Sequence, residues 1–226
     1  MNARHASNRR RGFIPAVMAL LLLGLVLWGC ENKDKGPEFV YSKSDPAEFE
    51  FQKGSDRPPT AKTLYSMARI LQAQDKRPQQ EFVLKRIIEL HPDFLPAYCD
   101  LAELYLYQRQ SHKSIAVLEG GLKQAPDAAI LINDLGVVYL AREEYPKALE
   151  QFSKAAGLPG ADVRYRANMA VALGMMGRYD EALALYEQVL RPSEAHYNLA
   201  VLAEARNDQE RARREYAVAE QLRKGD

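Results

Sequence analysis

The sequence lacks the patterns that mark a nucleic-acid-binding protein or a nucleotide-dependent enzyme. Its 226 residues hold 31 basic and 30 acidic side chains, and no basic stripe with interleaved aromatic residues is present to bind a nucleic acid. No Gly-rich phosphate loop follows a strand, because no segment has the pattern of a strand. We therefore expect no nucleic-acid partner and no cofactor.

The sequence also has few residues from which a catalytic or metal site could be built. Such a site would have to start from Cys99 with His91, Asp100, Glu103 and His112. Neither histidine lies three or four positions from Cys99 on one helical face, as a compact nucleophile or metal site would favour. We expect no enzymatic activity, no metal site and no small-molecule substrate.

What the chain does have is a column of small residues at regular spacing. Ala68, Ala102, Gly136 and Ala170 recur every 34 residues, and Ala200 follows one helical turn early. A second set lies twelve residues further on and consists of Gln80, Ser114, Ala148, Ala182 and Ala212. Small residues on two apolar stripes allow two helices to approach closely, and such a pair must stack on the next to bury its faces.

The most complete copy reads Leu135-Gly136, Tyr139, Tyr145, Ala148, Phe152, Ala155 and resembles the tetratricopeptide repeat (TPR) pattern. The resemblance implies an all-α fold, a TPR superhelical solenoid of about five helix-turn-helix repeats, in a protein that binds other proteins. We place the TPR domain at 61–226, with the fourth repeat short by about one helical turn. The repeats are 61–94, 95–128, 129–162, 163–192 and 193–226.

Residues 1–29 have the pattern of an export signal. Four arginines and no acidic residue precede an apolar run from Phe13 to Trp28, which ends in Leu27-Trp28-Gly29-Cys30. This ending resembles a bacterial lipobox, which implies that Cys30 is lipidated and becomes the first residue of the mature chain. An uncleaved membrane anchor is the alternative, although about 16 apolar residues are few for a membrane span. The segment Arg10 to Ile14 also resembles the core of a twin-arginine export signal, so the export route stays open.

The segment 30–60 is rich in charge, Pro and Gly, and we expect it to be a flexible linker. Glu31 stands where an aspartate would favour retention in the inner membrane, so we expect a lipid anchor in the outer membrane, facing the periplasm. Asp45-Pro46-Ala47-Glu48 has the residues of a helix start. Phe39, Tyr41, Phe49 and Phe51 either dock on the repeats or on a partner, or are scattered linker aromatics.

Helix geometry predicts which side chains line an inner groove for a protein partner. Positions offset from the small column by −3, −2, +1, +4 and +5 lie on the side of the first helix away from its packed face. In TPR proteins an Asn at −2 commonly holds the backbone of a bound peptide, which the resemblance carries to Asn168 and Asn198. The candidate groove residues are Tyr65, Arg69, Asp100, Glu103, Tyr107, Asp134, Val137, Ala141, Asn168, Val171, Met175, Tyr197, Asn198 and Val201.

Two alternatives apply to this groove. The valines are equally expected to pack against the next first helix, and the Asn and Asp side chains to satisfy the adjacent helix. The basic residues that TPR domains use to hold an acidic C-terminus are missing, so we do not expect that ligand.

The sequence therefore indicates a lipid-anchored scaffold that brings proteins together in the cell envelope. Its lipobox and repeats are similar to the TPR lipoproteins of tight-adherence and type IV pilus assembly systems, which implies a role in pilus or secretion-apparatus assembly. The alternative is an adaptor for peptidoglycan hydrolases or synthases.

Overall fold

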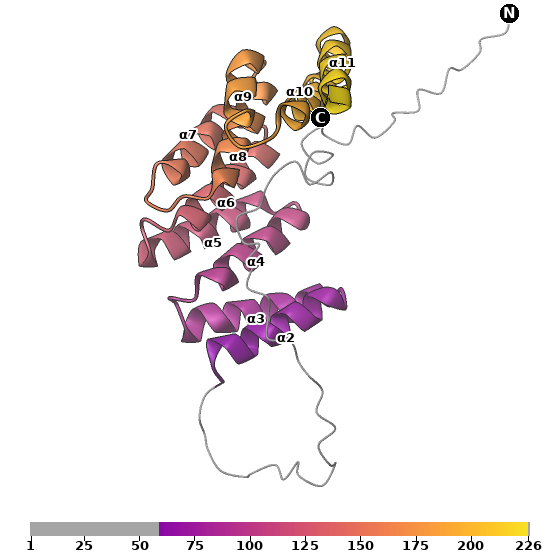
Figure 1. Cartoon of the computed structure of the whole chain (residues 1–226). Helices are drawn as coiled ribbons and strands as arrows, with labels where there is room; N and C mark the ends of the chain where they lie inside the picture. Colours follow the sequence, from indigo (N-terminus) through magenta and orange to yellow (C-terminus); the bar gives the residue numbers. More distant parts are fainter. Residues whose placement is uncertain (1–58, 226) are drawn as a thin grey trace, which may run out of the picture. The chain divides into compact units, whose positions relative to one another are not determined.

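The computed structural model describes residues 59–225, and within this range the chain forms ten α-helices and no strand. The predicted signal peptide, Cys30 and the linker up to residue 58 lie outside the described residues. The helices are α2 (Ala61–Ala73), α3 (Arg77–Leu90), α4 (Leu95–Tyr107), α5 (Ser111–Gln124), α6 (Ala129–Ala141), α7 (Tyr145–Ala156), α8 (Val163–Met175), α9 (Tyr179–Tyr186), α10 (Pro192–Ala205) and α11 (Gln209–Gly225) (Figure 1).

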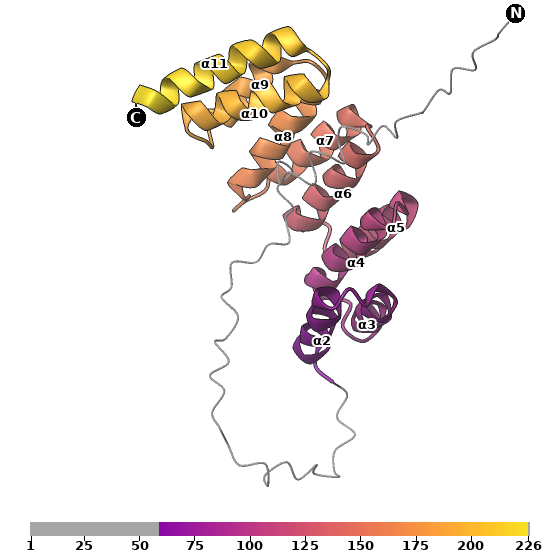
Figure 2. The ribbon, with the colours of Figure 1, turned by 90° about the vertical axis from the view of Figure 1, so that its right-hand side faces the viewer.

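The described chain divides into two compact units, each a stack of helical hairpins. The first unit, residues 59–126, holds the hairpins α2–α3 and α4–α5, joined by packing of α3 against α4. The second unit, residues 127–225, holds α6–α7, α8–α9 and α10–α11, whose stacking Figure 2 shows from the side. In it α7 packs on α8, α9 packs on α10, and α8 contacts both α6 and α10. Each unit is thus a helical solenoid, and the predicted all-α repeat fold is confirmed.

The small column lies where the helices of a hairpin cross. Ala68, Ala102, Ala170 and Ala200 are fully buried. At the remaining position, Gly136, a Cβ atom would lie 2.6 Å from the ring of Phe152 on α7. The second column is buried as well, and its Ser114 hydroxyl donates a 2.8 Å hydrogen bond to the Ala102 carbonyl oxygen. The sequence periodicity therefore identified the crossing residues correctly.

Each hairpin turns through one residue with a left-handed backbone, at the same place in every repeat. These residues are Asp75, Arg109, Glu143, Gly177 and Asn207, with φ between 55° and 81°. At Glu143 the turn has the two hydrogen bonds of a Schellman motif, Glu144 N–H to Tyr139 O and Glu143 N–H to Leu140 O. The same pair of bonds recurs in the other four turns. The first helices of all five hairpins therefore end in the same way, although only one of the five residues is glycine.

The fourth hairpin is the short one. Helix α9 has 8 residues, whereas the other second helices have 12 to 17. The next hairpin starts at Pro192, the last residue of the range 163–192 that the sequence indicated. Pro92, Pro126 and Pro159 likewise lie just after the second helices α3, α5 and α7. Among the described residues, no helix combines the length and the apolar character needed to cross a membrane.

The crossing at Gly136 is open to a direct test. We expect Gly136→Leu to lower the free energy of unfolding by about 1–3 kcal/mol, because the new side chain would overlap the Phe152 ring. The matched control is Gly120→Leu in α5, where a Cβ atom would meet nothing within 4 Å. Urea unfolding of both variants measures the difference. Equal stabilities would mean that Gly136 does not lie at a close crossing.

Candidate functional site

Two hollows in the described residues contain side chains that the sequence analysis selected, one in each unit. The first, which we call the acidic pocket, has a volume of about 180 Å³ and lies in the first unit. The second, the α10–α11 groove, has a volume of about 980 Å³ and lies in the second unit.

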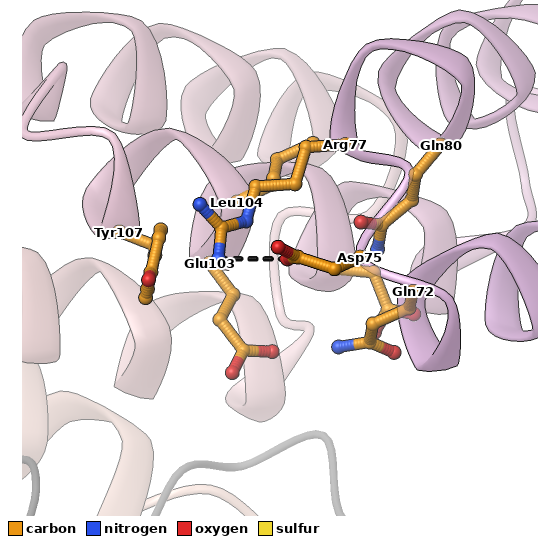
Figure 3. A pocket seen from close by; sticks show the side chains of 8 residues that line it. Gln72, Asp75, Arg77, Gln80, Glu103, Leu104 and Tyr107 are labelled. Carbon is orange, nitrogen blue, oxygen red and sulfur yellow. Dashed lines mark ion pairs between the residues drawn. The ribbon is translucent and has the colours of Figure 1, made fainter.

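Helix α4 supplies half of the acidic pocket. Its four lining residues are spaced so that they lie on one helix face: Asp100, Glu103, Leu104 and Tyr107. Gln72 at the end of α2, Asp75 in the left-handed turn, and Arg77 and Gln80 at the start of α3 complete the lining. The pocket is therefore lined from one side by the α2–α3 turn and its flanking residues and from the other by α4, and Figure 3 shows these side chains.

Arg77 is held between an acid and an aromatic ring in this pocket. Its guanidinium lies 2.7 Å from the Asp75 carboxylate and 3.9 Å from the centre of the Tyr107 ring (Figure 3). Asp75, in the left-handed turn, thus pairs with the first residue of α3. The pocket therefore presents three carboxylates and one guanidinium that is already paired, a balance that favours cationic groups over anionic ones.

Asp100 is the buried acid of the pocket, with 3% of its surface exposed. Its Oδ2 atom accepts no hydrogen bond, and the closest cation is Arg69, 3.7 Å away on α2. Burial raises the pKa of Asp100 above the ordinary value of 3.8, and the opposing effects of Tyr65 and Arg69 do not restore it. Tyr65 in turn packs edge-on against Phe94, with ring centres 5.2 Å apart. The structure thus brings Tyr65, Arg69 and Glu103 close to Asp100, and it places Tyr107 in the lining of the same pocket.

The α10–α11 groove is bordered by aromatic rings and ion pairs. Tyr197 on α10 is 54% exposed, and its ring meets that of Tyr216 on α11 at 5.5 Å in an edge-to-face arrangement. The Tyr216 hydroxyl donates a 2.9 Å hydrogen bond to Glu204, and burial together with this bond raises its pKa to about 12. Asn198 lies beside Tyr197 in the lining. The full lining is Leu190, Arg191, Ser193, Glu194, Tyr197, Asn198, Tyr216, Ala219, Glu220 and Arg223.

The other candidate residues of the second unit are less accessible. Val137, Val171, Asp134 and Asn168 have no exposed surface and Met175 has 3%, whereas Ala141 and Val201 are partly exposed. The buried state of the two valines agrees with the packing alternative that the sequence left open. Partner binding at these residues stays a prediction.

The buried polar residues of α6 and α8 bond to one another. Asn168 Nδ2 donates a 2.8 Å hydrogen bond to Asn133 Oδ1, and Asn133 Nδ2 donates to Asp134 Oδ1 at 3.2 Å. Asn168 therefore links α8 to α6, the first helices of two neighbouring hairpins. This agrees with the alternative that its side chain satisfies an adjacent helix. Asn198, by contrast, lies in the lining of the α10–α11 groove.

Sequence reasoning missed the residues that the turns and second helices supply to both hollows. Asp75 and Arg77 flank a turn, and Tyr216 and Glu220 lie on α11. The residue type gave no signal for Asp75, because the equivalent left-handed positions of the other hairpins carry Arg109, Glu143, Gly177 and Asn207. Among the described residues, no group of three or more His, Cys, Asp or Glu side chains is arranged to hold a metal ion.

A stack of similar helical hairpins is the architecture of helical repeat proteins. Tetratricopeptide-repeat family models match residues 99–162, 163–191 and 193–217, together just over half of the chain. The chain belongs to the tetratricopeptide-repeat family, whose members are generally non-catalytic scaffolds that bind protein partners.

Similarity to individual curated proteins is partial. The chain is 30% identical over 90 residues, or 40% of its length, to Superkiller complex protein 3 of Mus musculus, and this match covers 6% of that protein. It is 28% identical over 97 residues, or 41% of its length, to the uncharacterized protein ycf37 of Cyanophora paradoxa, of which the match covers 56%. The chain thus matches less than two thirds of the length of either relative.

Solved structures share the fold at low sequence identity. The pilF protein of Pseudomonas aeruginosa has a TM-score of 0.57 and 17% identity, covering 71% of this chain and 75% of that one. YrrB, a TPR protein with an unusual peptide-binding site, has a TM-score of 0.51 and 22% identity, covering 71% of this chain and 84% of that one. These likenesses show a common fold.

The buried Asp100 predicts a pH-dependent stability. Because its pKa is raised in the folded state, the folded chain keeps a proton that the unfolded chain has lost, and this residue's contribution to stability falls as the pH rises above 3.8. We expect Asp100→Asn to be more stable than the natural chain at pH 7, by about 1 kcal/mol, because a poorly compensated buried charge is removed. The gain should shrink toward pH 4.5.

Urea unfolding at both pH values measures this effect, and Asp93→Asn at an exposed position is the control. A loss of stability at pH 7 in Asp100→Asn would show that the Arg69 ion pair outweighs the burial of the charge.

Proposed function

We propose that this chain is a lipid-anchored scaffold of a bacterial cell envelope that binds a segment of a partner protein in the α10–α11 groove. The observation that carries the proposal is the groove itself. It has about 980 Å³ of space, and Tyr197 and Asn198 in its lining were selected from the sequence as partner-binding residues. Exposed tyrosine with adjacent amide and charged groups is the composition of a surface that recognises a peptide.

The chemistry of the groove favours an amphipathic segment. The Tyr197 and Tyr216 rings and Leu190 offer apolar contact, while the Asn198 amide can pair with a peptide backbone. Two ion pairs line the same groove, Arg191 with Glu194 at 2.5 Å and Arg223 with Glu220 at 2.8 Å. Because both signs of charge are present in equal number, the groove selects apolar and hydrogen-bonding groups more than net charge.

The envelope location is supported by the sequence, through the apolar run ending at Cys30 and the lipobox that it resembles. We further propose that the machine assembled is a pilus or secretion apparatus. The fold shared with the pilF protein is in keeping with this role. Recovery of peptidoglycan hydrolases or synthases as the bound partners would replace this part of the proposal with the adaptor role.

The groove is tested by exchanging its exposed aromatic residue. We expect Tyr197→Ala to lower the amount of partner protein that co-purifies from solubilised envelopes by about tenfold, since an aromatic anchor contributes more than about 1 kcal/mol to an interface. The control is Val163→Ala, because Val163 is similarly exposed, at 56%, but does not line the groove. Equal recovery with both variants would remove the α10–α11 groove as the binding site.

The anchor is tested separately. We expect Cys30→Ser to release the processed protein from the membrane fraction, because the described residues contain no helix suited to a membrane span. Labelling with a radioactive fatty acid followed by membrane fractionation measures the effect. A Cys30→Ser variant that still takes up the label would contradict lipidation at Cys30, and one retained with an uncleaved signal would support the plain membrane anchor.

A further inference from the structure

The end of the first unit that α2 and α3 form is apolar and exposed. Met67 and Ile70 on α2 are 51% and 58% exposed, and Phe82 on α3 is 72% exposed. Beside them lies a hollow of about 410 Å³, which we call the end pocket. Its lining is Leu64, Met67, Pro78, Gln79, Phe82, Val83 and Arg86. Arg86 is the one charged residue of this lining, so the pocket suits apolar side chains.

The repeat register shows that this end presents a face on which other hairpins of the chain carry a packed helix. Met67 and Ile70 occupy the positions that Leu101 and Leu104 hold on α4, one residue before and two after the small column. Both leucines are buried, and α3, the second helix of the preceding hairpin, packs on α4. The corresponding Leu199 and Leu202 of α10 are fully buried in the same way, with α9 packed on that helix. Met67 and Ile70 thus belong to a stacking face on which no described helix lies.

Helix α11, the last of the described helices, has a different outer surface. Its exposed residues include Arg213, Arg214, Arg223 and Lys224, as expected where a solenoid meets water. The α2–α3 end keeps Met67, Ile70 and Phe82 instead. Apolar surface that is retained at such a position indicates an occupant.

We propose that residues 45–53 of the same chain cover this end, with Phe49 and Phe51 placed on the end pocket. The segment reads Asp45-Pro46-Ala47-Glu48-Phe49-Glu50-Phe51-Gln52-Lys53. Its two aromatic side chains match an apolar hollow, and its three acids can join Glu89 in pairing with Arg86, the cation of the lining. This inference goes beyond the proposed function, since it concerns how the chain covers its own repeats.

The length of the connection permits this contact. Seven residues, 54–60, separate the segment from the start of α2 at Ala61, and they can span up to about 25 Å. Met67 lies six residues into α2, about 9 Å along the helix axis. A tether this short gives an effective concentration in the millimolar range, which a second molecule does not reach at cellular abundance. The chain's own segment therefore occupies the end pocket ahead of a second copy.

In a lipid-anchored protein, this contact would shorten the part of the linker that is free to extend. With residues 45–53 bound to the first unit, the residues between Cys30 and the repeats that can still extend are 31–44. These 14 residues reach at most about 50 Å when fully extended. Docking would thus bring the repeats closer to the membrane than a free linker of 30 residues allows.

A tryptophan placed in the segment tests the contact. The chain has a single tryptophan, Trp28, so the full-length variant Trp28→Phe with Phe51→Trp reports on position 51 alone. We expect its fluorescence to be quenched by acrylamide at least about twofold less than that of a free peptide spanning residues 39–58 with the same substitution, because burial excludes the quencher. Adding Met67→Glu should restore quenching to the level of the peptide.

The control for Met67→Glu is Val163→Glu, because Val163 is exposed to a similar degree, 56%, in the other unit. The control should leave the protection of the introduced tryptophan unchanged. Circular dichroism checks that both variants keep their helices, and Phe82→Gln replaces Met67→Glu if the latter does not fold. Protection that rises with protein concentration would assign the end pocket to a second copy and overturn the proposal. Equal quenching in protein and peptide would overturn it as well.

Discussion

Two helices can approach closely only where one of them has no bulky side chain at the crossing, and the described part of this chain depends on that constraint. At the α6–α7 crossing the side chain of Gly136 is a hydrogen atom, and the Phe152 ring fills the space that a Cβ atom would need. The crossing fixes which face of each first helix is turned inward. That orientation decides which residues reach the next hairpin, and so which ones are left for a partner.

The periodic part of this arrangement could be predicted from the sequence because the crossing residues recur at the spacing of the repeat. Gly136 and Ala170 are both small, as the pattern requires. A large residue at either position would have hidden the period. The short fourth hairpin was also foreseeable, because Ala200 arrives early in the column. The left-handed turns could not be predicted, because four of the five carry residues other than glycine, such as Arg109 and Glu143.

The candidate sites were predicted only in part, for physical reasons. An apolar residue that packs on a neighbouring helix and one that faces a groove look the same in a single sequence, which is why Val171 could not be assigned before its burial was known. The same holds for Asn168, whose amide serves a hydrogen bond to Asn133. Residues such as Asp75 and Arg77 enter the acidic pocket only because a turn folds back over α4. That approach depends on tertiary structure and leaves no local pattern.

The short fourth hairpin shows how a protein of this kind can change its length. The small column advances by 30 residues instead of 34 from Ala170 to Ala200, and Ala200 is still fully buried. The missing residues come after Ala182, the fully buried crossing residue of α9, because the spacing from Ala170 to Ala182 is the usual twelve. The turn is therefore absent from the end of α9, beyond the crossing, and residues 187–191 join the short helix to α10. The second helix of such a hairpin can thus lose its last turn without moving either crossing residue out of the core.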